Sequence, residues 1–134
     1  FCHVHKSIHS EDVKKAKELH PDALVLAHPE CTSDTLALAD FIGSTSQIID
    51  YATASDSKKF LICTEMGVFY ELMQKNPDKK FFSVGHRQFC PNMKKVSLDK
   101  VLEKLEDLKD EVILPEEMCE QAKKPLDEML RLAQ

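Results

Sequence analysis

The stretch Ala23-Leu24-Val25-Leu26-Ala27, which lies between His20-Pro21-Asp22 and His28-Pro29, decides the fold class. All of its residues are apolar, and a short apolar run between breakers is typical of a strand that is buried on both faces. Such strands occur in parallel sheets that helices cover on both sides. The stretch therefore predicts an α/β domain, and the rest of the chain should supply further strands and helices.

Three more apolar segments predict strands, namely Phe41-Ile42, Phe60-Leu61-Ile62-Cys63 and Phe81-Phe82-Ser83-Val84. Helical spacing of apolar residues predicts helices between them that begin near Ser10, Thr32, Gly43, Val68 and Ser97, with the second extending through Ala39. A last helix is expected over 115–134, where Pro125 should kink or divide it. Strand, polar turn and helix in repetition predict a three-layer αβα domain with a short parallel sheet.

Length and composition narrow the class of protein. A chain of 134 residues is about the size of one domain, and no apolar stretch approaches the roughly 20 residues that span a bilayer. The net charge of -5, with acids and bases interspersed, argues against nucleic acid as a partner. Five widely spaced cysteines indicate a reduced intracellular protein. Because the first residue is Phe, we expect a segment of a longer chain.

Polar side chains follow each predicted strand, where parallel α/β sheets carry their ligand sites. These residues are His28, Glu30, Ser44, Thr45, Thr64, Glu65 and Cys90. Taken alone, each motif leaves alternatives open. His28-Pro29-Glu30-Cys31 fits a metal site, a catalytic site or a polar strand end, and Gly43-Ser44-Thr45-Ser46 fits an anion site at a helix start or a plain helix cap. Cys2-His3-Val4-His5 and Cys90-Pro91 fit metal ligation or chance.

Taken in order, the motifs resemble the quinolinate synthase family. The resemblance rests on Cys2-x-Val4-His5, His28-Pro29-Glu30-Cys31, the block 39–49, Thr64-Glu65-x-Gly67, Asn76-Pro77-Asp78-Lys79 and Cys90-x-Asn92-Met93-Lys94. It implies the C-terminal part of a protein made of three similar αβα domains. Residues 1–134 would then form one such domain, with 1–9 as a connector that carries a cluster cysteine and 10–134 as the domain with its C-terminal helices.

The resemblance also implies a cofactor and a set of site residues. A [4Fe–4S] cluster would be held by Cys2, Cys90 and a third cysteine outside this chain. Glu30 and His28 would be the catalytic pair, with Glu30 as general acid/base. Ser44, Thr45, His5, His28 and Glu30 would bind substrate. Cys31, although it belongs to a motif, is expected to be a packing residue.

The implied activity is the condensation of iminoaspartate with dihydroxyacetone phosphate to quinolinate, a cytoplasmic step of NAD biosynthesis. Expected partners are these substrates, the N-terminal domains of the same protein, and an L-aspartate oxidase or dehydrogenase that supplies iminoaspartate. Neither nucleic acid nor a membrane is expected to bind. The isolated segment should be inactive. The alternative is a non-catalytic αβα module that holds a small anion at the strand ends.

Overall fold

The computed structural model describes residues 2–85, 88–109 and 111–133, which fall into two compact units, Phe1–Lys94 and Lys95–Gln134. The first unit holds the sheet, and the second holds two helices. The expectation of one domain over 1–134 stays a prediction.

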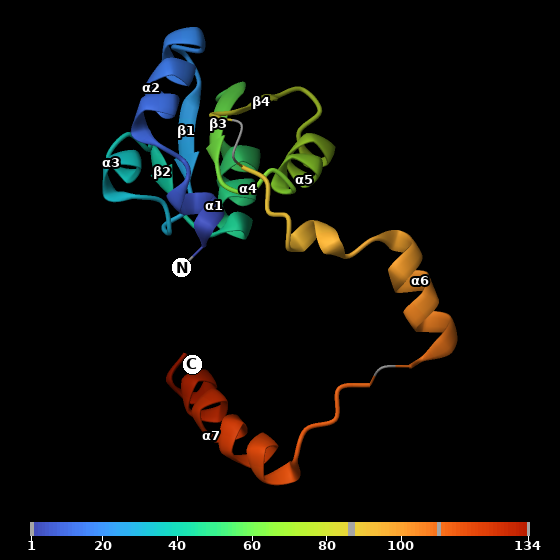
Figure 1. Ribbon diagram of the computed structural model, residues 1–134. Helices are drawn as coiled ribbons and strands as arrows, with labels where there is room; N and C mark the ends of the chain where they lie inside the picture. The colour runs from blue at the N-terminus through green and yellow to red at the C-terminus, as the bar shows by residue number, and fades with distance from the viewer. Residues whose placement is uncertain (1, 86–87, 110, 134) are drawn as a thin grey trace. The chain divides into compact units, whose positions relative to one another are not determined.

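A parallel sheet forms the centre of the first unit. In the described residues its strands are β1 (Leu24–Ala27), β2 (Phe41–Ile42), β3 (Lys59–Cys63) and β4 (Lys80–Ser83), in the order β2-β1-β3-β4. Every neighbouring pair is parallel, so the carboxyl ends of the strands meet at one edge (Figure 1). The predicted α/β fold is confirmed, and the strands fall on the four predicted apolar segments.

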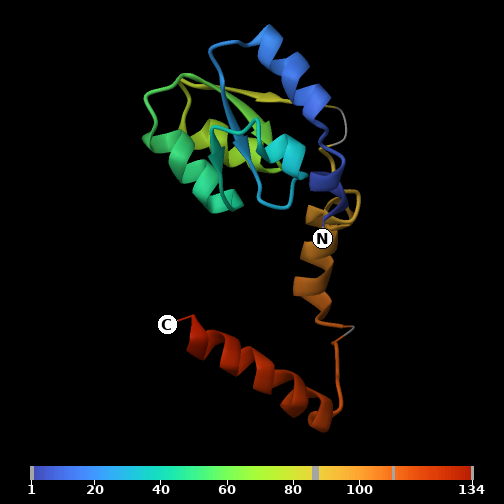
Figure 2. The same cartoon turned by 90° about the vertical axis from the view of Figure 1, so that its left-hand side faces the viewer.

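Helices cover both faces of this sheet. They are α1 (His3–Lys6), α2 (Ser10–Leu19), α3 (Ser33–Leu36), α4 (Thr45–Ala54) and α5 (Val68–Lys75). Helices α2 and α3 lie on one side of the sheet, and α4 and α5 lie on the other (Figures 1 and 2). This is the three-layer arrangement that the repeated pattern predicts.

Helix α3 is shorter than expected, since it ends at Leu36 and not at Ala39. The chain continues in tight turns because Asp40 must reach β1 to start the next strand. Its Oδ2 accepts from the backbone N–H of Val25 at 2.7 Å, and its own N–H donates to the Val25 carbonyl at 2.8 Å. These two bonds bring the chain into β2 before another helical turn can form.

The apolar strands are buried on both faces because successive side chains alternate between two cores. In β3, Leu61 and Cys63 pack with the α2 side, whereas Phe60 and Ile62 pack with the α4 and α5 side. All four side chains have no exposed surface. Burial of each large aliphatic or aromatic side chain stabilises a fold by about 1.5–3 kcal/mol. The apolar run is therefore the signature of a central strand.

The stretch expected to be a connector, residues 1–9, contains helix α1 and contributes to the core. Val4 is fully buried, and Ile8 belongs to the same core cluster as Leu61. This anchoring holds α1 against the carboxyl edge of the sheet, where its histidines lie.

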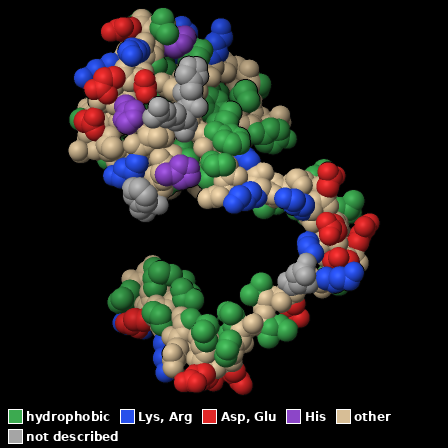
Figure 3. Space-filling model, viewed as in Figure 1, with side chains coloured by type: hydrophobic (Ala, Val, Ile, Leu, Met, Phe, Trp, Pro, Cys, Tyr) green, Lys and Arg blue, Asp and Glu red, His purple; other side chains and the backbone are tan. Residues whose placement is uncertain are grey.

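The second unit contains α6 (Leu98–Asp107) and α7 (Glu116–Leu132). Pro125 lies inside α7 without dividing it, so of the two expected effects division is wrong and a kink stays a prediction. The helix is exposed here, and the carbonyl that loses its N–H partner can bond to water. Hydrophobic side chains such as Met129 and Leu130 remain more than half exposed and gather along α7 (Figure 3). None of the helices in the described part of the chain combines the length and apolar character needed to cross a membrane.

Gly43 joins β2 to α4 in a space too small for a side chain. A Cβ there would lie 2.7 Å from Cε1 of Phe41 and 2.9 Å from Cβ of Gln47, and the Phe41 ring is held by stacking on Tyr51. We expect Gly43→Ala to lower the free energy of unfolding by about 1–3 kcal/mol, measured with urea, because overpacking forces neighbours to shift. Gly85→Ala is the control, since its nearest atom lies at an ordinary 3.6 Å. Equal losses in both variants would contradict this reading.

Candidate active site

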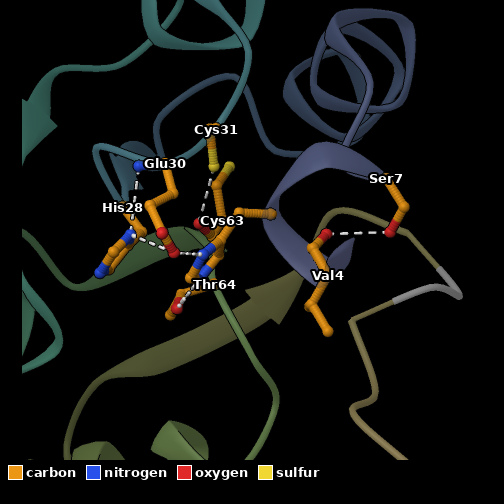
Figure 4. Close-up of polar contacts among 8 residues, drawn as sticks. Val4, Ser7, His28, Glu30, Cys31, Cys63 and Thr64 are labelled. Atoms are coloured by element: carbon orange, nitrogen blue, oxygen red, sulfur yellow. Dashed lines mark hydrogen bonds and ion pairs between the residues drawn. The ribbon is translucent and has the colours of Figure 1, made fainter. Parts of the chain in front are cut away.

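Side chains from three separate segments meet where β1 and β3 end. His28 and Glu30 follow β1, Thr64 follows β3, and His5 comes from α1. Figure 4 shows His28, Glu30 and Thr64 close together at this edge. The last residues of β1 and β3 are paired in register, so the residues that follow them begin at the same level of the sheet.

His5 contacts the other three residues of this group and is only 7% exposed. Its Nδ1 lies 2.9 Å from Oε2 of Glu30, and its Nε2 lies 2.9 Å from Oγ1 of Thr64. An ionised carboxylate can only accept, so Nδ1 donates to Glu30. In the neutral ring Nε2 then accepts the hydroxyl hydrogen of Thr64. The two partners thus set both the orientation and the tautomer of His5.

His28 stacks on His5, with ring centroids 4.1 Å apart and planes inclined by 7°. Its Nδ1 accepts the backbone N–H of Glu30 at 3.2 Å. Burial, followed by the proximity of His5, holds the pKa of His28 below its usual value. The ring is therefore neutral near pH 7 with its proton on Nε2, which makes it a hydrogen-bond donor.

Glu30 supplies the carboxylate of the group, and 38% of its side chain is accessible. The hydrogen bond from His5 is the largest effect that lowers the pKa of Glu30 below its usual range. Glu30 is accordingly ionised near neutral pH. A partly exposed carboxylate held by a buried histidine is suited to accept a proton and return it later.

Cys2 lies next to this histidine–carboxylate group. It is the residue directly before helix α1 and is partly buried, and one ligand atom each from Cys2, His5 and Glu30 lies within 4.8 Å of the others. Thiol, imidazole and carboxylate are metal-ligand types. In the described residues this group includes two predicted site residues besides Cys2, but not Cys90.

Cys90 lies in the loop after β4, as predicted, and is 8% exposed. Its backbone N–H donates to Oε1 of Glu65 at 3.2 Å, and Lys94 forms an ion pair with the same oxygen at 3.2 Å. Burial raises the pKa of Glu65, but the N–H groups of Gly67 and Cys90, with Lys94, outweigh it and lower that pKa. Glu65 thus ties the Cys90 loop to the end of β3.

Ser44 and Thr45 lie at the start of α4, which follows β2. Ser44 forms a capping box, because its Oγ accepts from the Gln47 N–H at 3.4 Å and its own N–H donates to Gln47 Oε1 at 2.8 Å. Of the two alternatives, an anion site or a plain helix cap, the hydrogen bonds of Ser44 in this structure are those of a helix cap. Thr45 is exposed and, with Thr64 and Glu65, lines a cavity of about 320 Å³. That cavity faces the same edge of the sheet as the histidine group.

Cys31 is a packing residue in this structure, although its motif attracts attention. It is 4% exposed, and its Sγ donates to the Cys63 carbonyl at 3.4 Å (Figure 4). Burial raises the pKa of the Cys31 thiol to about 11 and also raises the pKa of Cys63. Neither thiol is a thiolate near neutral pH, so neither is poised to act as a nucleophile.

Sequence reasoning did not assign roles to Thr64, Glu65 and Gln88. The first two follow β3, and their place at a strand end was the available signal. Gln88 is 3% exposed and makes hydrogen bonds to both β3 and β4. No local pattern marks it, because its partners lie up to 26 residues away in the sequence.

The fold and the site together define a class: an α/β domain with an acid–base group and metal-ligand side chains at the carboxyl edge of a parallel sheet. Comparison with known families adds the family: the one described as "Quinolinate synthetase A protein" matches residues 1–131. The chain therefore belongs to the quinolinate synthase family, whose members are enzymes of NAD biosynthesis.

Curated relatives agree with this assignment. A quinolinate synthase of Caldicellulosiruptor bescii is 52% identical over 132 residues, and one of Caldicellulosiruptor saccharolyticus is 50% identical over 133 residues. "Quinolinate synthase 2" of Methanosarcina acetivorans is 45% identical over 133 residues. The matches cover 98–99% of this chain but only 43–44% of the relatives' length.

Proposed function

We propose that this chain is the C-terminal part of a quinolinate synthase. That enzyme condenses iminoaspartate with dihydroxyacetone phosphate to quinolinate. The observation that carries the proposal is the convergence of Cys2, His5, His28 and Glu30 at the carboxyl edge of the sheet, in a chain that matches the family over residues 1–131. We also propose a cytoplasmic location, and an L-aspartate oxidase or dehydrogenase as the source of iminoaspartate.

The proposal assigns the proton transfers to Glu30. Its carboxylate is ionised and partly exposed, so it can take a proton from a bound intermediate during isomerisation and give one during dehydration. His5 donates to the Glu30 oxygen that lies 2.9 Å away, which keeps the carboxylate in one orientation. His28 is neutral and offers its Nε2–H to a substrate oxygen.

In this proposal, Ser44 and Thr45 bind the anionic groups of the substrate. Both lie at the N-terminus of α4, where helix dipole and backbone N–H groups favour negative charge. Thr45 lines the cavity beside Thr64, so its hydroxyl can reach a ligand there. Ser44 keeps its hydroxyl hydrogen available as a donor, because its Oγ acts as the acceptor in the capping box.

The donor set of this chain fits an iron–sulfur cluster. Cys2 lies directly before α1, Cys90 lies in the loop that follows β4, and both are free thiols. Thiolates are the ligands that such clusters prefer. We propose that these two cysteines hold a [4Fe–4S] cluster together with a third cysteine from the remainder of the protein. When bound, a cluster with one iron free of protein ligands supplies an open Lewis-acid position for the substrate.

The activity is proposed for the whole protein, because this chain spans about 44% of the length of its relatives. The other part would supply the third cysteine and two similar αβα domains. We therefore expect residues 1–134 alone to form no quinolinate.

Anaerobic reconstitution of the full-length protein with iron and sulfide tests the proposal. We expect cluster absorbance and, with both substrates, formation of quinolinate detected by chromatography. The segment 1–134 under the same conditions is the control without turnover. A full-length protein that binds no cluster and forms no quinolinate, yet binds phosphate or a dicarboxylate, would favour the anion-binding module.

A further inference from the structure

The side-chain amide of Gln88 bridges β3 and β4 at their carboxyl ends, and it is almost completely buried. Its Nε2 donates to the carbonyl oxygens of Ile62 and Thr64, both at 2.6 Å. Its Oε1 accepts from the backbone N–H groups of Val84 at 2.8 Å and Gly85 at 3.3 Å. Both N–H groups of the amide therefore donate a hydrogen bond, and the amide oxygen accepts hydrogen bonds.

This position requires a group that donates in one direction and accepts in the other. Pairing between β3 and β4 ends at Ile62 and Ser83, so beyond this pair the two strands have no ladder hydrogen bonds to each other. The Gln88 amide takes the place of one further peptide group between the strands. A glutamate of the same size would bring a carboxylate oxygen against two carbonyl oxygens, and a methionine would offer neither donor nor strong acceptor.

The bridge holds the segment that carries Cys90, two residues further on. The Gln88 carbonyl accepts from the Met66 N–H at 2.8 Å, and the Cys90 N–H donates to Glu65 Oε1 at 3.2 Å. After Cys90, the Lys94 N–H donates to the Cys90 carbonyl at 3.3 Å, and Lys94 Nζ pairs with Glu65. The cysteine is thus tied to the end of β3 on both sides, with Gln88 as the buried member of the set.

We infer that Gln88 is a positioning residue that keeps the Cys90 loop closed on the sheet and the Cys90 thiol buried at its carboxyl edge. The value of this closure for cluster binding rests on the proposed function, in which Cys90 is a ligand. The closure itself does not depend on a cluster. A loop held in one place presents its thiol without the entropy cost of ordering the segment when a cluster binds.

The test measures how often the loop opens in the cluster-free, full-length protein. Iodoacetamide labels thiols, and mass spectrometry of the peptides gives a separate rate for Cys90 and for Cys63, which is fully buried in the core. We expect Gln88→Glu to raise the Cys90 rate by about tenfold or more, because unsatisfied buried groups favour the open state. The Cys63 rate should stay at the wild-type value.

Gln74→Glu is the matched control, since it makes the same chemical change at an exposed site on α5. It should leave the Cys90 rate unchanged. Gln88→Met repeats the test without the opposing oxygens, and it decides the matter if the Glu variant does not fold. A Cys90 rate at the wild-type value in Gln88→Met, or Cys63 and Cys90 rates that rise together in it, would overturn the inference.

A second measurement concerns the reconstituted protein. Gln88→Glu should lose iron to a chelator faster than wild type and Gln74→Glu, followed by cluster absorbance. Equal rates of iron loss would remove the link between loop closure and ligand retention. Wild-type protein that binds no cluster would instead refute the proposed function, and the labelling rates would still decide whether Gln88 closes the loop.

Discussion

Cys90→Ala in the full-length protein is expected to abolish both cluster absorbance and quinolinate formation. A [4Fe–4S] cluster with three protein ligands loses a third of its attachment when one thiolate is removed, and an alanine methyl group offers no donor. The thiol is nearly buried, and its loop is tied to Glu65 and Lys94, so no described residue of that loop replaces it without rearrangement. Absorbance, iron content and product formation measure the result.

Cys119→Ala is the control for the loss of a thiol. Cys119 is exposed on α7, and its replacement should leave cluster content and turnover at the wild-type level. If Cys90→Ala retains both the cluster and quinolinate formation, the assignment of Cys90 as a ligand fails. Cys2→Ala should behave as Cys90→Ala does, because the proposal gives both cysteines the same role.

Glu30→Gln is expected to retain the cluster but to lower kcat by about 10²–10⁴-fold, the usual contribution of a general acid/base. The amide keeps the size of the side chain and an oxygen that can accept from His5 Nδ1, so the local structure should persist. It cannot take a proton near neutral pH. The variant therefore separates proton transfer from the assembly of the site.

Steady-state kinetics and cluster absorbance, measured on the same preparation, check this prediction. Glu11→Gln makes the same change at an exposed position in the first turn of α2 and should leave kcat unchanged. Unchanged turnover in Glu30→Gln would remove Glu30 from the mechanism. Loss of the cluster would instead assign Glu30 a role in holding the site together.

The strands could be predicted because burial on both faces leaves a direct mark on the sequence. Phe60-Leu61-Ile62-Cys63 is apolar throughout, since alternate side chains enter different cores. The length of α3 could not be predicted in this way, because it ends where Asp40 bonds to β1 and not where helical residues run out. Pro125 does not divide α7 for a related reason: in an exposed helix the carbonyl that loses its N–H partner can bond to water.

Some features of the site could also be predicted from the sequence, and others could not. His28 and Glu30 could be placed at the edge of the sheet, because they follow a recognisable strand. The contacts of His5 with Glu30 and Thr64 join residues 25 and 59 positions apart, and no local pattern encodes such pairs. The resemblance to quinolinate synthase supplied His5 as a candidate, but its geometry and its partners came from the structure.

By itself, the sequence determined the parallel sheet and the edge at which chemistry is placed, because burial on both faces of a strand and the polar residues that follow it are visible in neighbouring residues. The tertiary structure decided which polar groups touch: His5 between Glu30 and Thr64, His28 stacked on His5, and Gln88 across the ends of β3 and β4. Hydrogen bonds and pKa values depend on distances of a few ångströms between segments far apart in the chain. Only the folded packing sets those distances.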